Sequence, residues 1–385
     1  MDFALTDEQE ILRESIKRFA EREVTPLIEE AEQNHTFPVG ILRQMGDLGY
    51  LGLPFPEELG GSADKDPFVT KINECIWHEE MSRVCAGISF GVSAAVGGAP
   101  GYILRDFGSE EQKQKHLVPA IRGQKIGAFS LTEPNAGSDA ASIQAKLKRD
   151  GDNYILNANK VFCSNGNIAD FITLAAYTDK DKGLEGISIV LIEKGMPGFE
   201  IGQKFMKLGF RSAENVELVL SDCRVPRSNL VGKEGQGWEI LMSALNQCRL
   251  NFSADAVGVA RAALEHSIKY SKERVQFGKP IGKFQAVAFK ISEMYAKIEA
   301  ARYLVYHAAW ALSRKKDARV EVSAAKMFSS RMASEVTTQA MEIHGGYGFI
   351  HDFPVERYFR DARLFYFGYG TEEIQKLVID RALGI

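Results

Sequence analysis

The chain has 385 residues, of which 45% are hydrophobic and 25% charged, and its formal net charge is -4 at pH 7. This length exceeds what one hydrophobic core usually serves, so two or three packed units are expected. Positive and negative charges are interspersed, so the sequence shows no basic patch of the kind that binds nucleic acid. It also has no run of about 18 uninterrupted apolar residues, so no membrane-spanning helix is predicted.

The first third of the chain has the pattern of helices. Thr6 and Gln9 form a capping box ahead of a helix, and helical patterns reach Leu48 and resume from Pro67 to Arg83. The acidic, helical start is unlike a signal or transit peptide, and the five cysteines include no CxxC pair. We therefore expect a helical domain over residues 1–125 in a cytoplasmic protein with reduced thiols and no metal site.

An extended region follows, and it opens with the stretch GAFSLTEPNAGSD at residues 127–139. A strand that runs into Pro-Asn-x-Gly must turn sharply, which leaves N–H groups free to hold a flat polar ring edge or a phosphate. An ordinary hairpin loop is the alternative. Runs rich in β-branched residues continue to Gly232 without a GxGxxG motif, so we expect an antiparallel β-domain over residues 126–232 and no Rossmann fold.

Helical periodicity returns after Gly232. Apolar residues recur at i, i+3, i+4 and i+7 in residues 284–314, another helix is expected over about 321–343, and a last one near Thr371. The predicted fold class is therefore α+β, with a C-terminal four-helix bundle over residues 233–385.

Six motifs occur along the chain in one order: FSLTEPNAGSD, NANKVFCSNGNIAD, LGFRSAENVELVLSDCRVPRSNLVGKEGQGW, ERVQFGKPIGKFQ, EIHGGYGF, and RYFRDAR with GTEEIQ. Together they resemble the acyl-CoA dehydrogenase family over essentially the whole chain. The resemblance implies one FAD per subunit, an acyl-CoA substrate, a homotetramer built as a dimer of dimers, and electron exchange with an electron-transfer flavoprotein. In that family a carboxylate removes the proton α to the thioester while the β-hydride passes to the flavin.

The resemblance also implies roles for individual residues. The residues expected to bind FAD are Phe129, Leu131, Thr132, Phe162, Ser164, Arg274, Phe277, Gln285, Glu342, Gly345, Gly346, Thr371 and Glu373. The residues expected to bind the substrate are Ser138, Gly91, Arg249 and Gly370. Glu342 and Glu373 depart from the family pattern, because Gln is usual at both places.

The catalytic carboxylate is missing from both positions where this family carries it. Tyr369 stands two residues before the Thr of the GT motif, and Cys248 stands immediately before Arg249. At pH 7 an unshifted phenol carries a handicap of roughly 4 kcal/mol as a base, whereas a thiol needs about 1.4 to 2.7 kcal/mol, so Cys248 is the better candidate. Asp255, two turns further along the same face, is the third candidate. Cys248 as a small buried hydrophobe and Asp255 as a packed polar residue are the alternatives.

The segment 87–101, GISFGVSAAVGGAPG, is rich in small residues. Such a segment either lets another body approach the helix backbone closely or packs tightly against other helices. Divergent family members carry a polar residue at the position that corresponds to Gly91, and this chain does not. We expect room for a bulky or cyclic acyl group here.

Three functions remain open from the sequence. The first is an FAD enzyme that oxidises or reduces the CH–CH group of an acyl-CoA thioester. The second is a redox-neutral lyase of a CoA thioester in which FAD is structural, and the third is a non-catalytic acyl-CoA-binding flavoprotein subunit.

Overall fold

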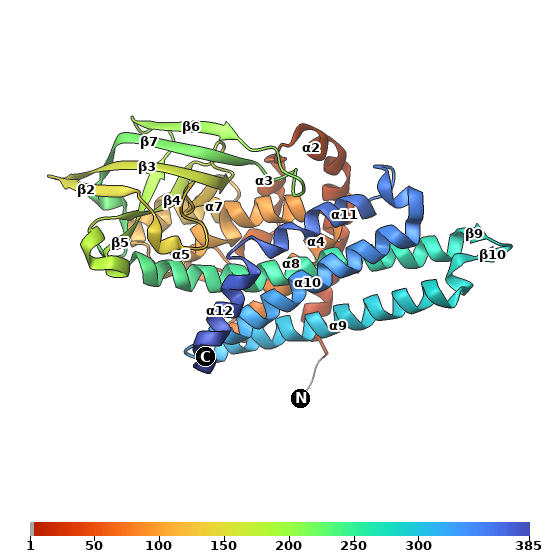
Figure 1. Cartoon of the computed structure of the whole chain (residues 1–385). Helices are drawn as coiled ribbons and strands as arrows, with labels where there is room; N and C mark the ends of the chain where they lie inside the picture. The colour runs from red at the N-terminus through yellow and green to blue at the C-terminus, as the bar shows by residue number, and fades with distance from the viewer. Residues whose placement is uncertain (1–3) are drawn as a thin grey trace.

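The computed structural model describes residues 4–385 and contains a helical layer, a β-domain and a long helical bundle (Figure 1). The helices are α1 Asp7–Phe19, α2 Ile28–Asn34, α3 Gly40–Asp47, α4 Pro67–Val92, α5 Ala99–Phe107, α6 Glu110–Gln112, α7 Val118–Ile121, α8 Gly237–Glu273, α9 Gln285–Arg314, α10 Arg319–His344, α11 Val355–Ala362 and α12 Glu372–Leu383. The strands are β1 Gly127–Ser130, β2 Lys146–Asp150, β3 Asn153–Ser164, β4 Phe171–Tyr177, β5 Ile187–Glu193, β6 Phe199–Lys204, β7 Asn215–Pro226, β8 Leu230–Val231, β9 Val275–Gln276 and β10 Lys279–Pro280. This arrangement confirms the predicted fold class.

Two helices begin with N-terminal caps at threonines that the sequence analysis named. Thr6 and Gln9 form the reciprocal capping box of α1, and Thr371 caps α12 through a bond from Ile374 N–H. Helix α4 is longer than its pattern indicated and is kinked at Cys85, whose φ of -155° is not helical. It continues into a π-helical segment at Ser93–Gly97.

The β-domain has an eight-stranded sheet in the order β6-β7-β3-β2-β4-β5-β8, with β1 paired to β4 off this path. Most neighbours are antiparallel, as expected, but β1 runs parallel to β4 with Gly127 opposite Phe171. The stretch that follows β1 is therefore not a hairpin loop, because its strand pairs with a distant partner. The sheet buries its own core, which includes Leu156, Leu174 and Leu218.

The β-domain lies at one end of the molecule, over α4 and α8, and the bundle of α8, α9 and α10 extends away from it (Figure 1). The short β9–β10 hairpin projects from the far end of this bundle. One stretch among the described residues, Pro67–Phe107, is long and apolar enough to cross a membrane, but 89% of its most apolar window is buried inside the fold. Packing in the core accounts for its composition.

Candidate functional site

The loop after β1 is fixed by a buried ion pair. Lys160 Nζ, on β3 and fully buried, donates to Leu131 O at 2.8 Å and to Glu133 Oε1 at 2.8 Å. Glu133 also accepts from the backbone N–H of Ala145 at 3.0 Å. Val161 N–H donates to Thr132 O at 2.9 Å. These bonds hold the end of β1 and the start of its loop in place. Three of the expected FAD residues there are half-buried, namely Phe129, Leu131 and Thr132, whereas Ser138 is exposed.

Phe162 is turned outward by an irregularity in β3. Its φ of 59° is unusual for a bulky residue, and the pairing of β3 with β7 shifts register between Lys160 and Cys163. The ring is 62% exposed and lies 5.0 Å from the Phe205 ring, centroid to centroid. Two residues on, Ser164 Oγ accepts a hydrogen bond from Asn215 Nδ2 at 3.2 Å. An outward aromatic face beside a half-buried hydroxyl fits the side of a flat ring system.

The turn at Tyr369 and Gly370 is held by donors from three helices. Tyr369 has φ 56° and Gly370 has φ 97°. Arg249 Nε of α8 donates to Tyr369 O at 3.0 Å, Lys326 Nζ of α10 donates to Gly370 O at 2.6 Å, and Gln375 Nε2 of α12 donates to Gly370 O at 3.1 Å. A left-handed conformation at a tyrosine costs of order 1–3 kcal/mol and persists only where its surroundings enforce it.

This turn places the Tyr369 phenol against the Cys248 thiol and two rings. The centroids of Phe252 and Phe90 lie 5.3 and 6.2 Å from that of Tyr369. Burial, with the neighbouring Cys248, raises the pKa of Tyr369 well above its usual range. Burial likewise raises the pKa of the Cys248 thiol to about 12. Burial thus raises the pKa of both candidate bases, and their order remains a prediction.

Asp255 is engaged in the interior. It is 2% exposed, and its Oδ1 lies 3.1 Å from His78 Nδ1 and accepts from Ser89 Oγ at 3.0 Å. Both contacts come from α4, so Asp255 joins α8 to α4. These contacts agree with a packed polar residue, and a role of Asp255 as the base remains a prediction.

Two expected substrate residues have different surroundings from those anticipated. A Cβ at Gly91 would lie 2.4 Å from the ring of Phe37. The Phe37 ring therefore fills the space beside Gly91 that we expected an acyl group to occupy. Arg249 is 5% exposed and uses its Nε on Tyr369 O and its Nη1 on Asn246 Oδ1 at 3.0 Å. The first of these bonds ties α8 to the Tyr369 turn, and contact of Arg249 with the substrate remains a prediction.

A second group of expected cofactor residues gathers at the far end of the bundle. An open pocket of about 450 Å³ is lined by Tyr270, Arg274, Gln276, Ile281, Ile343, His344, Gly345, Gly346, Tyr347 and Ile350. Gly345 has φ 60°, and nothing would lie within 4 Å of a Cβ at either glycine. The Arg274 guanidinium lies over the Tyr347 ring, 5.5 Å from its centroid. A cation beside open glycine backbone suits a phosphate-bearing ligand.

The remaining expected cofactor contacts are exposed. Phe277, at the tip of the β9–β10 hairpin, is 94% exposed, and Gln285 is exposed at the start of α9. Glu342 pairs with Lys290 of α9, and Glu373 lies 3.8 Å from Lys376 Nζ. Each of the two carboxylates that depart from the family pattern thus has a lysine that compensates its charge.

The expected FAD residues therefore form two groups at opposite ends of one chain, the first beside the β-domain and the second at the end of the bundle (Figure 1). The outward Phe162 and the open Gly345–Gly346 backbone fit the two ends of a dinucleotide. One chain alone does not bring them together. Among the described residues, no cluster of three His, Cys, Asp or Glu could hold a metal ion.

Comparison with known families accounts for nearly the whole chain. Residues 6–124, 128–223 and 235–384 match the N-terminal, middle and C-terminal domains of acyl-CoA dehydrogenase. The chain belongs to the acyl-CoA dehydrogenase family. Family members bind FAD, and the chain is an FAD-dependent enzyme of this family.

Two relatives and two solved structures show the extent of the similarity. The short-chain specific acyl-CoA dehydrogenase of Clostridium acetobutylicum is 42% identical over 98% of both chains. The acryloyl-CoA reductase (NADH) of Anaerotignum propionicum is 41% identical over 99% of this chain and 95% of its own. Butyryl-CoA dehydrogenase from Megasphaera elsdenii superposes with a TM-score of 0.95 at 40% identity over 100% of both chains. A chain in a study of the electron transferring flavoprotein of Acidaminococcus fermentans gives a TM-score of 0.95 at 43% identity, covering 100% of this chain and 99% of its own.

Sequence reasoning missed several residues that pack against or hydrogen-bond to the expected site residues. These are Phe37, Glu133, Lys160, Lys326 and Gln375. A buried lysine has no periodic or motif signal in a single sequence, since Lys160 and Lys326 look like ordinary surface charges until the fold encloses them.

Proposed function

We propose that this acyl-CoA dehydrogenase family member works as a reductase of α,β-unsaturated acyl thioesters, with Tyr369 as the proton donor to the α-carbon. The observation that carries the proposal is the buried phenol of raised pKa where family members have a carboxylate. A group that stays protonated is a poor base for dehydrogenation and a suitable acid for the reverse reaction.

The reduction needs a hydride at the β-carbon and a proton at the α-carbon. When bound and reduced by two electrons, the flavin of FAD would supply the hydride. The α-carbanion of a thioester is a much stronger base than phenolate, so proton transfer from the Tyr369 hydroxyl to that carbon is favourable. The phenolate left behind regains its proton from water after the product leaves. The 41% identity to an acryloyl-CoA reductase agrees with this direction.

We retain the bulky or cyclic acyl group as part of the proposal, with its location revised. Phe37 fills the space at Gly91. The half-buried ring of Phe90 beside Tyr369 offers a face on which a flat unsaturated or cyclic group can pack, with the buried Phe252 ring behind it.

The partners we propose follow from the two separate cofactor groups and from the relatives. A second copy of the chain brings the far pocket to the β-domain of its neighbour, in a homotetramer built as a dimer of dimers. An electron-transfer flavoprotein supplies the electrons, as the similarity to a structure from such a system suggests. The enzyme works in the cytoplasm, in keeping with its five free cysteines.

The proposal is tested by following both half-reactions without oxygen. Reduced holoenzyme is mixed with straight, branched and aryl-substituted enoyl-CoA esters, and oxidised holoenzyme with the saturated counterparts, while the flavin absorbance is recorded. We expect at least one enoyl ester to restore the oxidised spectrum rapidly. Failure of every enoyl ester, with release of a non-redox product, would favour the lyase; tight binding without any product would favour the non-catalytic subunit.

A further inference from the structure

Lys326 is a buried cation that is used on a single backbone carbonyl. It lies on α10, is 1% exposed, and its Nζ donates to Gly370 O at 2.6 Å. Within residues 4–385 it forms no ion pair with a carboxylate. Removing an ammonium group from water without such a partner is costly.

The groups around Lys326 add to this cost. The Arg249 guanidinium of α8 is a second buried cation in its surroundings, and the nearby Glu372 of α12 is already paired with Arg331 and with Lys376 at 2.7 Å. Glu373 of α12 is exposed to solvent and also faces Lys376. Burial and Arg249 together lower the pKa of Lys326 to about 7. A residue that only stabilised the fold would be better replaced here by an apolar side chain.

The carbonyl that Lys326 holds belongs to the residue directly after the proposed proton donor. Gln375 Nε2 also donates to this carbonyl, at 3.1 Å, so Lys326 supplies the shorter of the two bonds that hold it. Because Gly370 has no side chain to oppose a change of its backbone angles, loss of the Lys326 bond would let this peptide rotate and release the left-handed Tyr369 to an ordinary conformation. The phenol would then leave its place beside Cys248 and Phe252. A donor that is misplaced by about 1 Å can lose about 100-fold in rate.

We propose that Lys326 is a positioning residue, which acts through the Gly370 carbonyl to keep the Tyr369 hydroxyl aimed at the substrate. The inference rests on the proposed function for the identity of the proton donor. The device is a hydrogen bond from a buried amine to one peptide carbonyl, so a neutral donor of similar length should replace it in part.

Two substitutions of similar length separate the hydrogen bond from the rest of the side chain. Lys326→Met removes the donor, and Lys326→Gln keeps an N–H donor without the charge. Lys297→Met, on the exposed Lys297–Glu335 pair between α9 and α10, is the matched control for loss of a lysine. The three variants and the parent are purified as holoenzymes, and the rate of flavin reoxidation by an enoyl-CoA, the Kd of that ester for the oxidised form, the FAD content and the Tm are measured.

We expect the flavin of Lys326→Met to be reoxidised about 100-fold more slowly than that of the parent. Its Kd and FAD content should be unchanged, and its Tm should be unchanged or higher. Lys326→Gln should be reoxidised at least tenfold faster than Lys326→Met. The control should match the parent. Equal rates in parent and Lys326→Met would overturn the inference, as would a parallel fall in FAD content and Tm.

A spectroscopic measurement keeps this test separate from that of the proposed function. With 3-fluorotyrosine placed at position 369, the 19F NMR spectrum of the holoenzyme should show one resonance in the parent and in Lys326→Gln. Lys326→Met should give several or broadened resonances. A single unchanged resonance in Lys326→Met would contradict the positioning role even if no enoyl ester turned over; a parent without turnover would count against the proposed function alone.

Discussion

At Tyr369 the pH dependence of the two half-reactions identifies the proton donor. Because burial keeps its pKa well above the usual range, the phenol stays protonated from pH 6 to 9. Reduction of an enoyl ester should therefore be independent of pH over this range. Oxidation of the saturated ester needs the phenolate, so its rate should rise about tenfold per pH unit. Stopped-flow traces at fixed ionic strength provide the measurement.

Substitution of Tyr369 should alter these profiles in a defined way. Tyr369→Phe should slow reduction by about 100- to 10,000-fold, since the proton donor is lost. Tyr369→Glu restores the usual carboxylate of the family, so reduction should now fall as pH rises and oxidation near pH 7 should increase. A parent whose reduction rate already falls above pH 6 would assign the proton to another group.

The cysteines permit a separate prediction about thiol reactivity. All five are buried, and burial raises the pKa of Cys248 and of Cys163 to about 12. The thiolate is the reactive species, so the native protein should resist iodoacetamide at pH 8 and react fully once unfolded. Intact-mass spectrometry gives the number of labels. One rapid label on Cys248 in the native state would reinstate it as a candidate base.

At the scale of single elements, the ion pair between Lys160 and Glu133 supports the loop after β1. Lys160→Met leaves Glu133 buried with only backbone donors, which should cost about 3 kcal/mol of stability. The loop that carries Leu131 and Thr132 should loosen, so FAD should be lost more readily. Thermal unfolding and the FAD content after gel filtration check both effects. Lys146→Met, on the exposed side of β2, is the control.

An element could be predicted from the sequence where interactions between neighbouring residues determine it. The capping box at Thr6 and the long helix from Gln285 rest on neighbours in sequence, and both occur as expected. The parallel pairing of β1 with β4 and the kink at Cys85 depend on contacts between distant segments, which no local pattern contains. The sequence predicted the substitution of the catalytic carboxylate. It could not predict that Phe37, far earlier in the chain, fills the space at Gly91.

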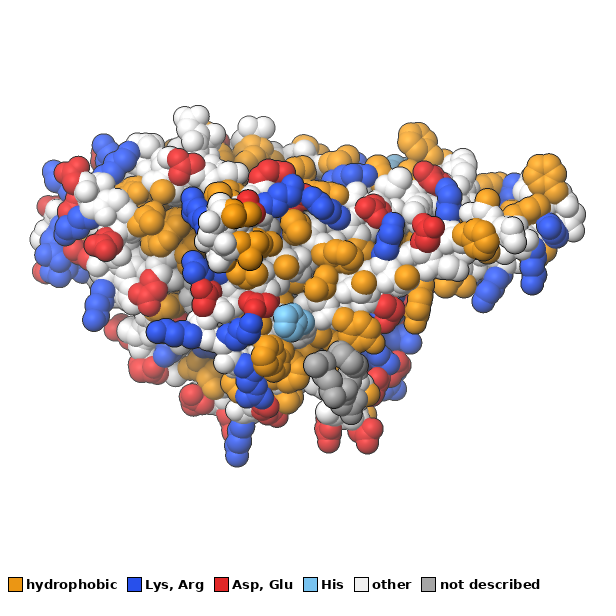
Figure 2. Space-filling model, turned by 60° about the horizontal axis from the view of Figure 1, so that its bottom comes forward, with side chains coloured by type: hydrophobic (Ala, Val, Ile, Leu, Met, Phe, Trp, Pro, Cys, Tyr) orange, Lys and Arg blue, Asp and Glu red, His pale blue; other side chains and the backbone are white. Residues whose placement is uncertain are grey.

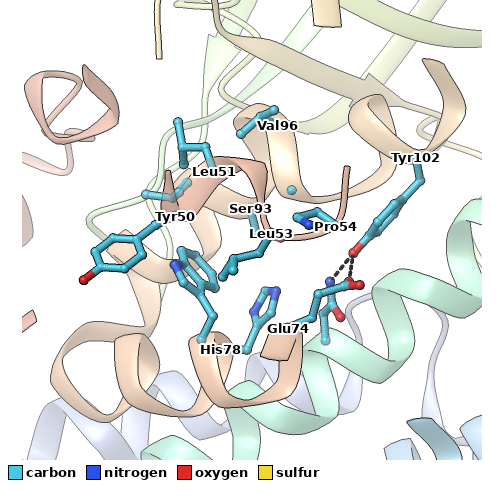
Figure 3. A pocket seen from close by; sticks show the side chains of 13 residues that line it. Tyr50, Leu51, Leu53, Pro54, Glu74, His78, Ser93, Val96 and Tyr102 are labelled. Carbon is cyan, nitrogen blue, oxygen red and sulfur yellow. Dashed lines mark hydrogen bonds between the residues drawn. The ribbon is translucent and has the colours of Figure 1, made fainter. Parts of the chain in front are cut away.

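At the scale of the whole molecule, apolar side chains lie exposed on the bundle, where we propose that a second copy packs. Figure 2 shows hydrophobic side chains along the bundle and on its projecting end. Exposed apolar residues of these parts of the chain are Phe277 and Val275 of the hairpin and Phe289, Tyr295 and Trp310 of α9. A cavity of about 20 Å³ between α4 and α5, where Tyr102 bonds to Glu74 and Asn251, has space for about one water molecule (Figure 3).

The projecting hairpin leads to a prediction that couples assembly to cofactor retention. Phe277 is 94% exposed in the single chain and stands beside Arg274, which lines the far pocket. If a neighbour's FAD and β-domain cover this end, Phe277→Asp should lower the sedimenting mass from about four chains toward one or two, and the FAD content should fall in parallel. Leu184→Asp, an exposed apolar position in the β-domain, should change neither quantity. Sedimentation velocity and the ratio of flavin to protein absorbance give both quantities on one sample. A Phe277→Asp protein that kept its full mass and its FAD would show that the two groups of cofactor residues do not meet across this interface.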